Sequence, residues 1–237
     1  MSGTPASELR RAAAAALLVG ALAASPAAAA DAAHPEVVEL FQSQGCSSCP
    51  PANANVMAIA DRPDILALSF QVTYWDQLGW KDTFAEPAYT ARQWDYARAF
   101  HRAEVATPEV VVNGRADVVG SNRAQLDALL HQADRGDGGP RVSAEGGRVT
   151  VSGAPAGARV MLVRYDPHIV QVAIRRGENG GKTLPHRNVV RQLAPLGAVA
   201  GAAPQSFALP AADLPGLKTA VLVQAAPGGP ILAAARV

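Results

Sequence analysis

The segment from residue 37 to residue 72 constrains the fold more than any other feature of the chain. VVELF at residues 37–41 and ILALSFQV at residues 65–72 are short apolar runs, as buried strands are. Between them, Val56 and Ile59 recur at helical spacing. A strand, a helix and a strand in succession form a crossover unit whose two strands are parallel. We therefore predict an α/β fold built on a βαβ unit.

A helix, a hairpin and a second helix are predicted to follow this unit. Residues 87–102 place aromatic side chains on one helical face, after a proline that suits the first turn. Asn113-Gly114 separates two β-branched runs and predicts a hairpin, because both turn residues must adopt positive φ. Residues 121–133 combine a capping sequence with a stripe of leucines. The order βαβ–α–ββα is thus assigned to residues 31–134.

The second half of the chain has a different sequence pattern. Residues 135–140 are rich in glycine and are the predicted linker. Beyond them, short strands separated by Gly, Pro and Asp predict a small antiparallel β-rich domain over residues 141–237. Charged residues make up 17% of the chain and nearly cancel to a net charge of +1. This balance argues against a nucleic-acid partner.

The first thirty residues have the composition of an export signal. Arg10 and Arg11 precede a short alanine-rich apolar stretch that ends in a small-residue cleavage site. This stretch is shorter than the roughly 20 residues that cross a bilayer. We predict that residues 1–30 are a signal peptide and that the mature protein, from about Asp31, is periplasmic or secreted and does not span a membrane. An alanine-rich N-terminal helix is the alternative.

Cys46 and Cys49 are the only cysteines of the chain. Disulfides persist outside the cytoplasm, but a bridge between these two closes so small a loop that it adds little stability. A redox role explains the pair better. Cys46 lies at the strand-to-helix junction, where the positive end of the helix favours a thiolate, so it is the predicted nucleophile. Cys49, expected one turn inside the helix, is the predicted resolving thiol.

Two other functions remain open for the same cysteines. Two thiolates suit Cu(I), so the protein is alternatively a periplasmic copper-binding chaperone. The five histidines are scattered, with none at a ligand-like spacing from Cys46, and a structural zinc site needs four ligands. We therefore predict no resident metal and no cofactor. A non-catalytic binding module with an inert disulfide is the second alternative.

The dipeptide Thr107-Pro108 stands immediately before the apolar run EVVV. In the order βαβ–α–ββα, this dipeptide and the C-x-x-C pair together resemble the motifs of thioredoxin-like oxidoreductases. The resemblance implies that Pro108 follows a cis bond beside the cysteines and that the backbone of Thr107 pairs with an extended substrate peptide. Residues 31–134 are accordingly expected to form a thioredoxin-like domain.

Four segments together resemble a more specific family. They are ELFQSQGCSSCPPA, YWDQLGWKDTFAEPAYTARQ, TPEVVVNGR and RRGENGGKTLPHRNVVRQL. The family contains exported bacterial proteins, is grouped with thioredoxin-like folds and is catalogued as a domain of unknown function, number twelve twenty-three. The resemblance covers essentially the whole mature chain, and the family name records no activity. Ser47-Ser48 between the cysteines and the inserted segment 73–87 depart from ordinary thioredoxins, which leaves the substrate class open.

Two further segments each have two interpretations. The aromatic residues of segment 74–84 either pack to hold an inserted loop or, through Trp75 and Trp80, form a hydrophobic lip that receives a substrate. The basic run from Arg175 to Arg191 is either a solvated hairpin or a contact with the first domain or an anionic partner.

Taken together, these patterns favour an exported thiol–disulfide oxidoreductase. Cys46 attacks, Cys49 resolves and Thr107-Pro108 shapes the site. The expected partners are thiol- or disulfide-containing proteins or small thiols, together with a redox partner protein.

Overall fold

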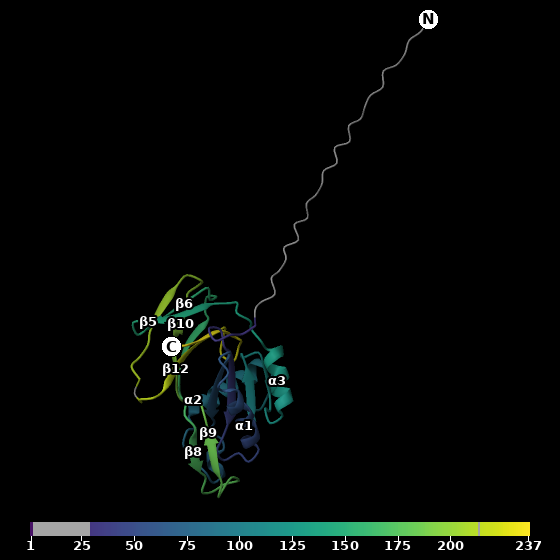
Figure 1. Cartoon of the computed structure of the whole chain (residues 1–237), viewed down its shortest axis with the longest axis vertical. Coiled ribbons are helices and arrows are strands. Elements are labelled where there is room, and N and C mark those ends of the chain that lie inside the picture. The colour runs from purple at the N-terminus through teal and green to yellow at the C-terminus, as the bar shows by residue number, and fades with distance from the viewer. Residues whose placement is uncertain (2–28, 213) are drawn as a thin grey trace.

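The computed structural model describes Met1, residues 29–212 and residues 214–237. These residues form a mixed α/β fold with one large sheet and a few helices (Figure 1). The helices are α1 (Cys49–Ile59), α2 (Pro87–Ala99), α3 (Arg123–Gln132) and the short 3₁₀ helix η1 (Asp76–Leu78). Most of the predicted signal peptide, residues 2–28, lies outside the described residues. No helix in the described part of the chain is long and apolar enough to cross a membrane.

Eight strands form the large mixed sheet. In spatial order they are β13 (Ile231–Arg236), β12 (Lys218–Gln224), β7 (Arg159–Asp166), β10 (Val189–Ala198), β2 (Ile65–Gln71), β1 (Glu36–Gln42), β3 (Glu109–Val112) and β4 (Ala116–Val118). β1 and β2 are parallel and α1 connects them, which confirms the predicted βαβ unit. β10 also runs parallel to β2, where Val189 pairs with Ser69, and the other neighbours are antiparallel.

Two smaller sheets come from the second half of the chain. One contains β11 (Gln205–Ala208), β6 (Arg148–Ser152) and β5 (Arg141–Glu145), and the other contains β8 (Val170–Ala173) and β9 (Thr183–His186). Both are antiparallel. The strands predicted for residues 141–237 are therefore present, but β7, β10, β12 and β13 join the large sheet and do not form a small antiparallel sheet of their own.

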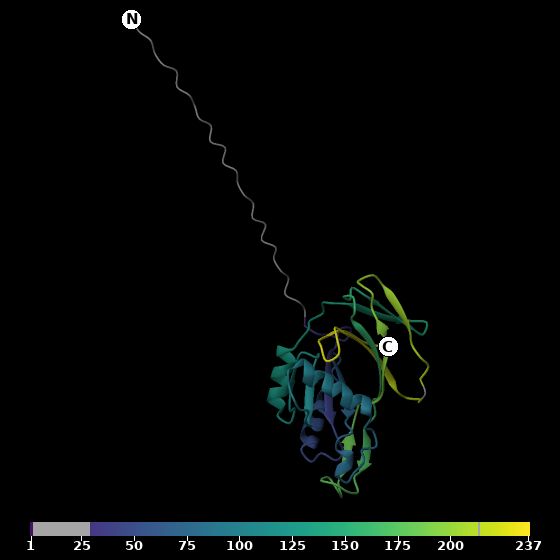
Figure 2. The same cartoon turned by 180° about the vertical axis from the view of Figure 1, so that it is seen from behind.

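The helices cover opposite faces of the sheet around β1, β2 and β3. On one face, α1 and α3 contribute Val56 and Leu126 to a buried cluster. On the other face, α2 contributes Tyr89 and Tyr96. Figure 2, which views the molecule from behind, shows α2 lying over this face. The rings of Tyr89 and Phe70 meet edge-on with their centroids 5.3 Å apart. The aromatic face predicted for residues 87–102 is thus buried against the sheet.

The core beneath α2 is shared by both halves of the chain. Met161 of β7 and Leu222 of β12 belong to the same buried cluster as Tyr89. Strands from both sides of residues 135–140 join one sheet, and the join is made where β10 pairs with β2. The division of the chain into two domains at residues 135–140 stays a prediction.

Local turn and cap signals are realised as the sequence predicts. Asn113 and Gly114 adopt φ of 50° and 61° and connect β3 to β4 as an antiparallel hairpin. The side chain of Asn122 accepts a hydrogen bond from the backbone N–H of Gln125 at 3.2 Å, so α3 begins at its predicted cap. Both motifs lie in the segment that follows the Thr-Pro dipeptide.

Candidate active site

The cysteine pair lies where β1 ends and α1 begins. Cys46 and Cys49 form a disulfide, with their Cα atoms 5.4 Å apart. Ser48 is the N-cap and Cys49 is the first helical residue, so the expectation that Cys49 lies one turn inside the helix is wrong. The physical reason is that Pro50 and Pro51 occupy the first turn, where the missing N–H groups cost little, and the helix begins directly before them. Both cysteines are nevertheless buried, at 0% and 1% exposure.

The Thr107–Pro108 peptide bond is cis, as the family resemblance implied. The hydroxyl of Ser48 donates to the carbonyl oxygen of Thr107 at 3.4 Å and lies 3.3 Å from Sγ of Cys46. On the other side of the dipeptide, the indole Nε1 of Trp75 donates to Oγ1 of Thr107 at 2.7 Å. The structure therefore gathers the predicted C-x-x-C, Thr-Pro and Trp75 residues in one place.

Trp80 holds the segment that leads into the cysteine pair. Its indole Nε1 donates to Oε1 of Gln44 at 2.9 Å, and Oδ2 of Asp82 accepts from the backbone N–H of Gln44 at 2.7 Å. Burial raises the pKa of Asp82 to about 6. Tyr74 and Trp75 pack against the main core, which agrees with the packing interpretation of this loop. Substrate binding by Trp75 and Trp80 stays a prediction.

The loop between β8 and β9, residues 174–182, covers the cysteine pair, and we call it the cover loop. Asn179 is fully buried, and its Nδ2 donates to the carbonyl oxygens of Gln44 and Cys46 at 3.0 and 2.9 Å. Nζ of Lys182 donates to Oδ1 of the same asparagine at 2.9 Å. One side chain thus ties the cover loop to the backbone on both sides of Gly45.

Glu178 makes the second attachment of the cover loop. Its Oε2 accepts from the hydroxyl and the backbone N–H of Ser47 at 2.6 and 3.1 Å. These hydrogen bonds hold the pKa of Glu178 below its usual value. Arg175 and Arg176, in contrast, are exposed. The basic run therefore contacts the first half of the chain through Glu178, Asn179 and also Arg187, which pairs with Asp61, while its first two arginines face solvent.

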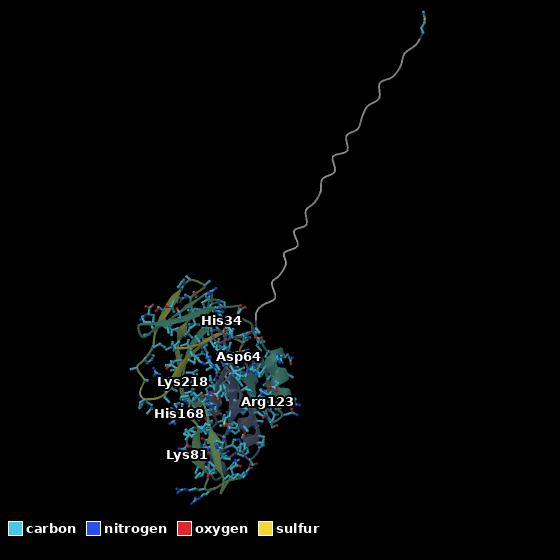
Figure 3. The ribbon with its side chains drawn as sticks, viewed as in Figure 1. His34, Asp64, Lys81, Arg123, His168 and Lys218 are labelled. Atoms are coloured by element: carbon cyan, nitrogen blue, oxygen red, sulfur yellow. A yellow bond between two sulfur atoms is a disulfide. The ribbon has the colours of Figure 1, made fainter. Side chains whose placement is uncertain are left out.

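The aromatic loop and the cover loop also touch one another. A Cβ placed on Gly177 would lie 3.3 Å from Cβ of Trp80, so the two backbones approach closely. Lys81 lies at the same end of the molecule as the β8–β9 hairpin, as comparison of Figures 1 and 3 shows. The two loops and the Thr-Pro segment together enclose the disulfide.

A cavity of about 50 Å³ lies beside Cys49. Its lining includes Cys49 and Asn53 from α1 and His186 from β9. His186 is 2% exposed, and neither of its ring nitrogens has a hydrogen-bond partner among the described residues. Burial lowers the pKa of His186 to about 4. Within the described part of the chain, no group of three or more His, Cys, Asp or Glu residues is arranged to hold a metal ion.

Comparison with known families identifies the chain. Residues 37–224 match the family described as "Protein of unknown function (DUF1223)". The chain belongs to the DUF1223 family. The family membership expected from the four sequence segments is therefore confirmed, over almost the whole of the expected range.

Two solved structures are similar to this DUF1223 protein. A crystal structure of an Agrobacterium tumefaciens protein is 32% identical, covers 88% of this chain and 94% of its own, and superposes with a TM-score of 0.68. The structure of HBP35 of Porphyromonas gingivalis is 12% identical, covers 86% of this chain and 74% of its own, and has a TM-score of 0.57, which shows likeness of fold alone. No curated protein matches the chain significantly.

Several residues of the enclosed site in this DUF1223 protein lie within the segments that resemble the family, but nothing in the sequence marked them individually as site residues. They are Gln44, Asp82, Glu178, Asn179 and His186. Each acts across a long sequence separation, and each is a common polar residue in a segment whose local pattern specifies only a strand or a turn. Unlike the cysteines and the Thr-Pro dipeptide, they have no characteristic spacing from which they could be recognised.

Proposed function

We propose that this protein is an exported thiol–disulfide oxidoreductase whose residues 31–134 form a thioredoxin-like domain. The proposal rests on one observation above all: the hydroxyl of Ser48, between the cysteines, reaches the carbonyl oxygen of Thr107 in the Thr-Pro dipeptide. The element order β1-α1-β2-α2-β3-β4-α3 supports the fold assignment. The small size of the disulfide loop supports a redox role, because such a loop gives the fold little stability.

The reaction would begin at the sulfur of Cys46. A substrate thiolate attacks this sulfur, the Cys46–Cys49 bond breaks, and its electron pair leaves on Cys49. A second substrate thiolate then attacks the substrate sulfur of the mixed disulfide and releases Cys46 as a thiolate. The substrate loses two electrons and the cysteine pair gains them, and the reverse sequence reduces a substrate disulfide. The positive end of α1 stabilises the thiolates formed here.

Access to Cys46 requires the cover loop to move. Because both cysteines are buried under Asn179 and its neighbours, a substrate sulfur reaches Cys46 only when the hydrogen bonds of the cover loop open. The backbone of Thr107 is then the edge with which an extended substrate peptide pairs. The protein would therefore act on thiols of flexible or unfolded segments, which can enter a narrow opening.

The reduction potential of the mature protein tests the proposal directly. The protein is equilibrated in glutathione buffers, and its free thiols are labelled and counted by mass spectrometry. We expect a potential above about −230 mV, which is the range of readily exchanged disulfides. A potential below about −300 mV, together with slow exchange, is typical of a structural disulfide and would contradict the proposal.

Single-cysteine variants assign the two thiols. The variant Cys49→Ser is expected to accumulate a mixed disulfide between Cys46 and a substrate, because the resolving thiol is missing. The variant Cys46→Ser serves as the control and is expected to accumulate none. Equal trapping by both variants would contradict the assigned roles.

The alternatives have distinct outcomes in the same experiments. Tight binding of Cu(I) by the reduced protein, with poor activity on disulfide substrates, would favour a copper-binding chaperone. Lack of both activities would favour a binding module with an inert disulfide. Export is tested separately, by N-terminal sequencing of the protein recovered from a bacterial periplasm, where a start near Asp31 is expected.

A further inference from the structure

His186 occupies an unusual position beside the resolving cysteine. It lines the same cavity as Cys49, although the two residues come from different elements, β9 and α1. It is almost fully buried, and neither ring nitrogen has a hydrogen-bond partner among the described residues. Buried polar groups are nearly always paired, so an unpaired imidazole in a cavity that Cys49 also lines calls for an explanation.

Hydrogen bonds between neighbouring residues, and not bonds of its own ring, hold His186 in position. Nδ2 of Asn53 donates to the carbonyl oxygen of Pro185 at 2.7 Å, which holds β9 against α1. Nε2 of Gln42 in turn donates to Oδ1 of Asn53 at 3.0 Å. The ring of Phe84 meets the imidazole edge-on, with centroids 6.1 Å apart. The imidazole is therefore held in place while its nitrogens stay free to exchange a proton.

We propose that His186 accepts the thiol proton of Cys49 when the reduced pair reacts, a role that rests on the oxidoreductase function proposed above. The proton moves from Sγ of Cys49 to a ring nitrogen of His186, directly or through a water molecule, for which the cavity has room. The Cys49 thiolate attacks Sγ of Cys46 in the mixed disulfide and forms the Cys46–Cys49 bond. The bond between Cys46 and the substrate breaks, and its electron pair leaves on the substrate sulfur. The substrate thiolate takes a proton from solvent, and the imidazolium returns its proton to solvent.

The electrostatic surroundings suit this role. Burial is what lowers the pKa of His186, so the ring is neutral and able to accept a proton at physiological pH while the disulfide is closed. The charged groups on neighbouring elements are otherwise engaged: Arg187 pairs with Asp61, and Arg191 lies over the ring of Phe84. Asp82 accepts from the backbone N–H groups of Gln44 and Phe84. A thiolate at Cys49 would supply the missing counter-charge and raise the affinity of the imidazole for a proton.

Nuclear magnetic resonance of the imidazole ring tests the proposal without any enzymatic assay. The full mature chain is titrated in its disulfide form and after reduction by a phosphine, and the His186 signal is assigned with His186→Gln. We expect the titration midpoint of His186 to rise on reduction. The rise should persist in Cys46→Ser, which keeps the Cys49 thiol, and vanish in Cys49→Ser. Identical titration in both redox states, or a rise that survives Cys49→Ser, would overturn the proposal.

A kinetic measurement separates the proton-acceptor role from a packing role. In His186→Gln, we expect resolution of a preformed mixed disulfide to slow by about 10²-fold, the lower range for loss of a general base, while initial attack by Cys46 is unchanged. His168→Gln is the matched control, because His168 is exposed on the surface (Figure 3) and bonded to Asp166. Slowing of both steps alike would indicate a packing role and contradict the proposal. Since the ring titration needs only chemical reduction, it remains informative even if the protein has no oxidoreductase activity.

Discussion

Asn179 donates a hydrogen bond from its side-chain amide to the backbone carbonyl oxygen of Cys46, 133 residues earlier in the sequence, at 2.9 Å. The same nitrogen also donates to the carbonyl oxygen of Gln44 at 3.0 Å. A single buried side chain therefore satisfies two carbonyl groups beside the disulfide. Because the hydrogen bonds are made to the backbone that carries Cys46, we expect opening of the cover loop to expose its sulfur.

The variant Asn179→Ala is expected to speed reduction of the disulfide by a small dithiol about tenfold. Each lost hydrogen bond contributes roughly 0.5–1.5 kcal/mol, and about 1.4 kcal/mol changes the open population tenfold. The rate is measured by quenching samples with a thiol-alkylating reagent and counting the labelled cysteines by mass spectrometry.

Asn55→Ala is the matched control for this prediction. Nδ2 of Asn55 also donates to two carbonyl oxygens, those of Gly120 and Ser121 at 2.9 and 3.0 Å, but these precede α3. The control removes the same kind of contact and should leave the reduction rate unchanged. If Asn179→Ala is reduced no faster than Asn55→Ala, the cover loop does not limit access to the disulfide.

Acid is expected to loosen the cover loop at Glu178. Its side-chain hydrogen bond with Ser47, and next the backbone one, lower the pKa of this carboxyl from the usual 4.5. A carboxyl with a lowered pKa stabilises the folded arrangement above the usual pKa, and that stabilisation is lost as the pH falls through the lowered pKa. Reduction of the disulfide by a phosphine should therefore accelerate below pH 4.5 relative to Glu178→Gln measured at each pH.

The reduction rate of the unsubstituted protein is divided by that of Glu178→Gln at each pH, because the phosphine itself changes reactivity with pH. Glu178→Gln lacks the titrating carboxyl, so it corrects for that change. A ratio that stays constant from neutral to acidic pH would show that the Glu178–Ser47 contact does not restrain the cover loop.

The parts of the fold that were predictable from sequence depend on neighbouring residues. Asn113-Gly114 forms a hairpin because the two residues tolerate positive φ, and Asn122 caps α3 because its side chain reaches an N–H three residues on. The cysteines and the Thr-Pro dipeptide were recognisable because their residue types and order form a known motif. Such local signals can be recognised without any knowledge of tertiary packing.

The cover loop and His186 were not predictable for the opposite reason. The segment around Asn179 is rich in glycine, so its pattern specifies a turn but not the surface against which the turn lies. His186 is buried only because β9 packs against α1, and the sequence spacing between Cys49 and His186 does not predict that packing. The pairing of β10 with β2 is equally non-local, and β10 contains Pro195, beside which its register with β7 shifts. Tertiary packing decided each of these features.

The variant Trp75→Phe is expected to weaken binding of a peptide substrate without changing the reduction potential. Phenylalanine keeps much of the ring packing but removes the 2.7 Å hydrogen bond from Nε1 to Oγ1 of Thr107. If this hydrogen bond contributes about 0.5–1.5 kcal/mol to the binding free energy of the peptide by positioning Thr107, its loss corresponds to a roughly 2- to 10-fold rise in KM. Steady-state kinetics with a disulfide-containing peptide measure this change.

Trp80→Phe is the comparison variant for this prediction, since it loses the indole hydrogen bond to Gln44 instead. It should alter KM less, because Gln44 is not part of the expected peptide-binding edge. A change in reduction potential with an unaltered KM in Trp75→Phe would assign Trp75 to the disulfide and not to the substrate.

A buried ion pair joins the helix on one face of the sheet to the strand that leads into the site. Nε and Nη2 of Arg92 in α2 donate to Oε1 and Oε2 of Glu39 in β1 at 2.7 and 3.0 Å. Nη1 of the same arginine donates to Oε1 of Gln224 in β12 at 3.1 Å. Both charged residues are at least nine-tenths buried. The pair therefore links the N-terminal strands, α2 and the C-terminal part of the sheet.

Removing one partner of this pair should destabilise the fold strongly. Arg92→Met is expected to lower the free energy of unfolding by about 3–5 kcal/mol, because it leaves the carboxylate of Glu39 buried without a counter-charge. Adding Glu39→Leu removes that charge and should restore most of the loss. Arg123→Met is the control: Arg123 (Figure 3) and Asp127 are 44% and 43% exposed, and such a pair contributes at most about 1 kcal/mol. Urea unfolding followed by tryptophan fluorescence measures the free energy of unfolding of all three variants. If the double variant is less stable than Arg92→Met, the hydrogen bonds of Glu39 contribute more to stability than its unpaired charge costs.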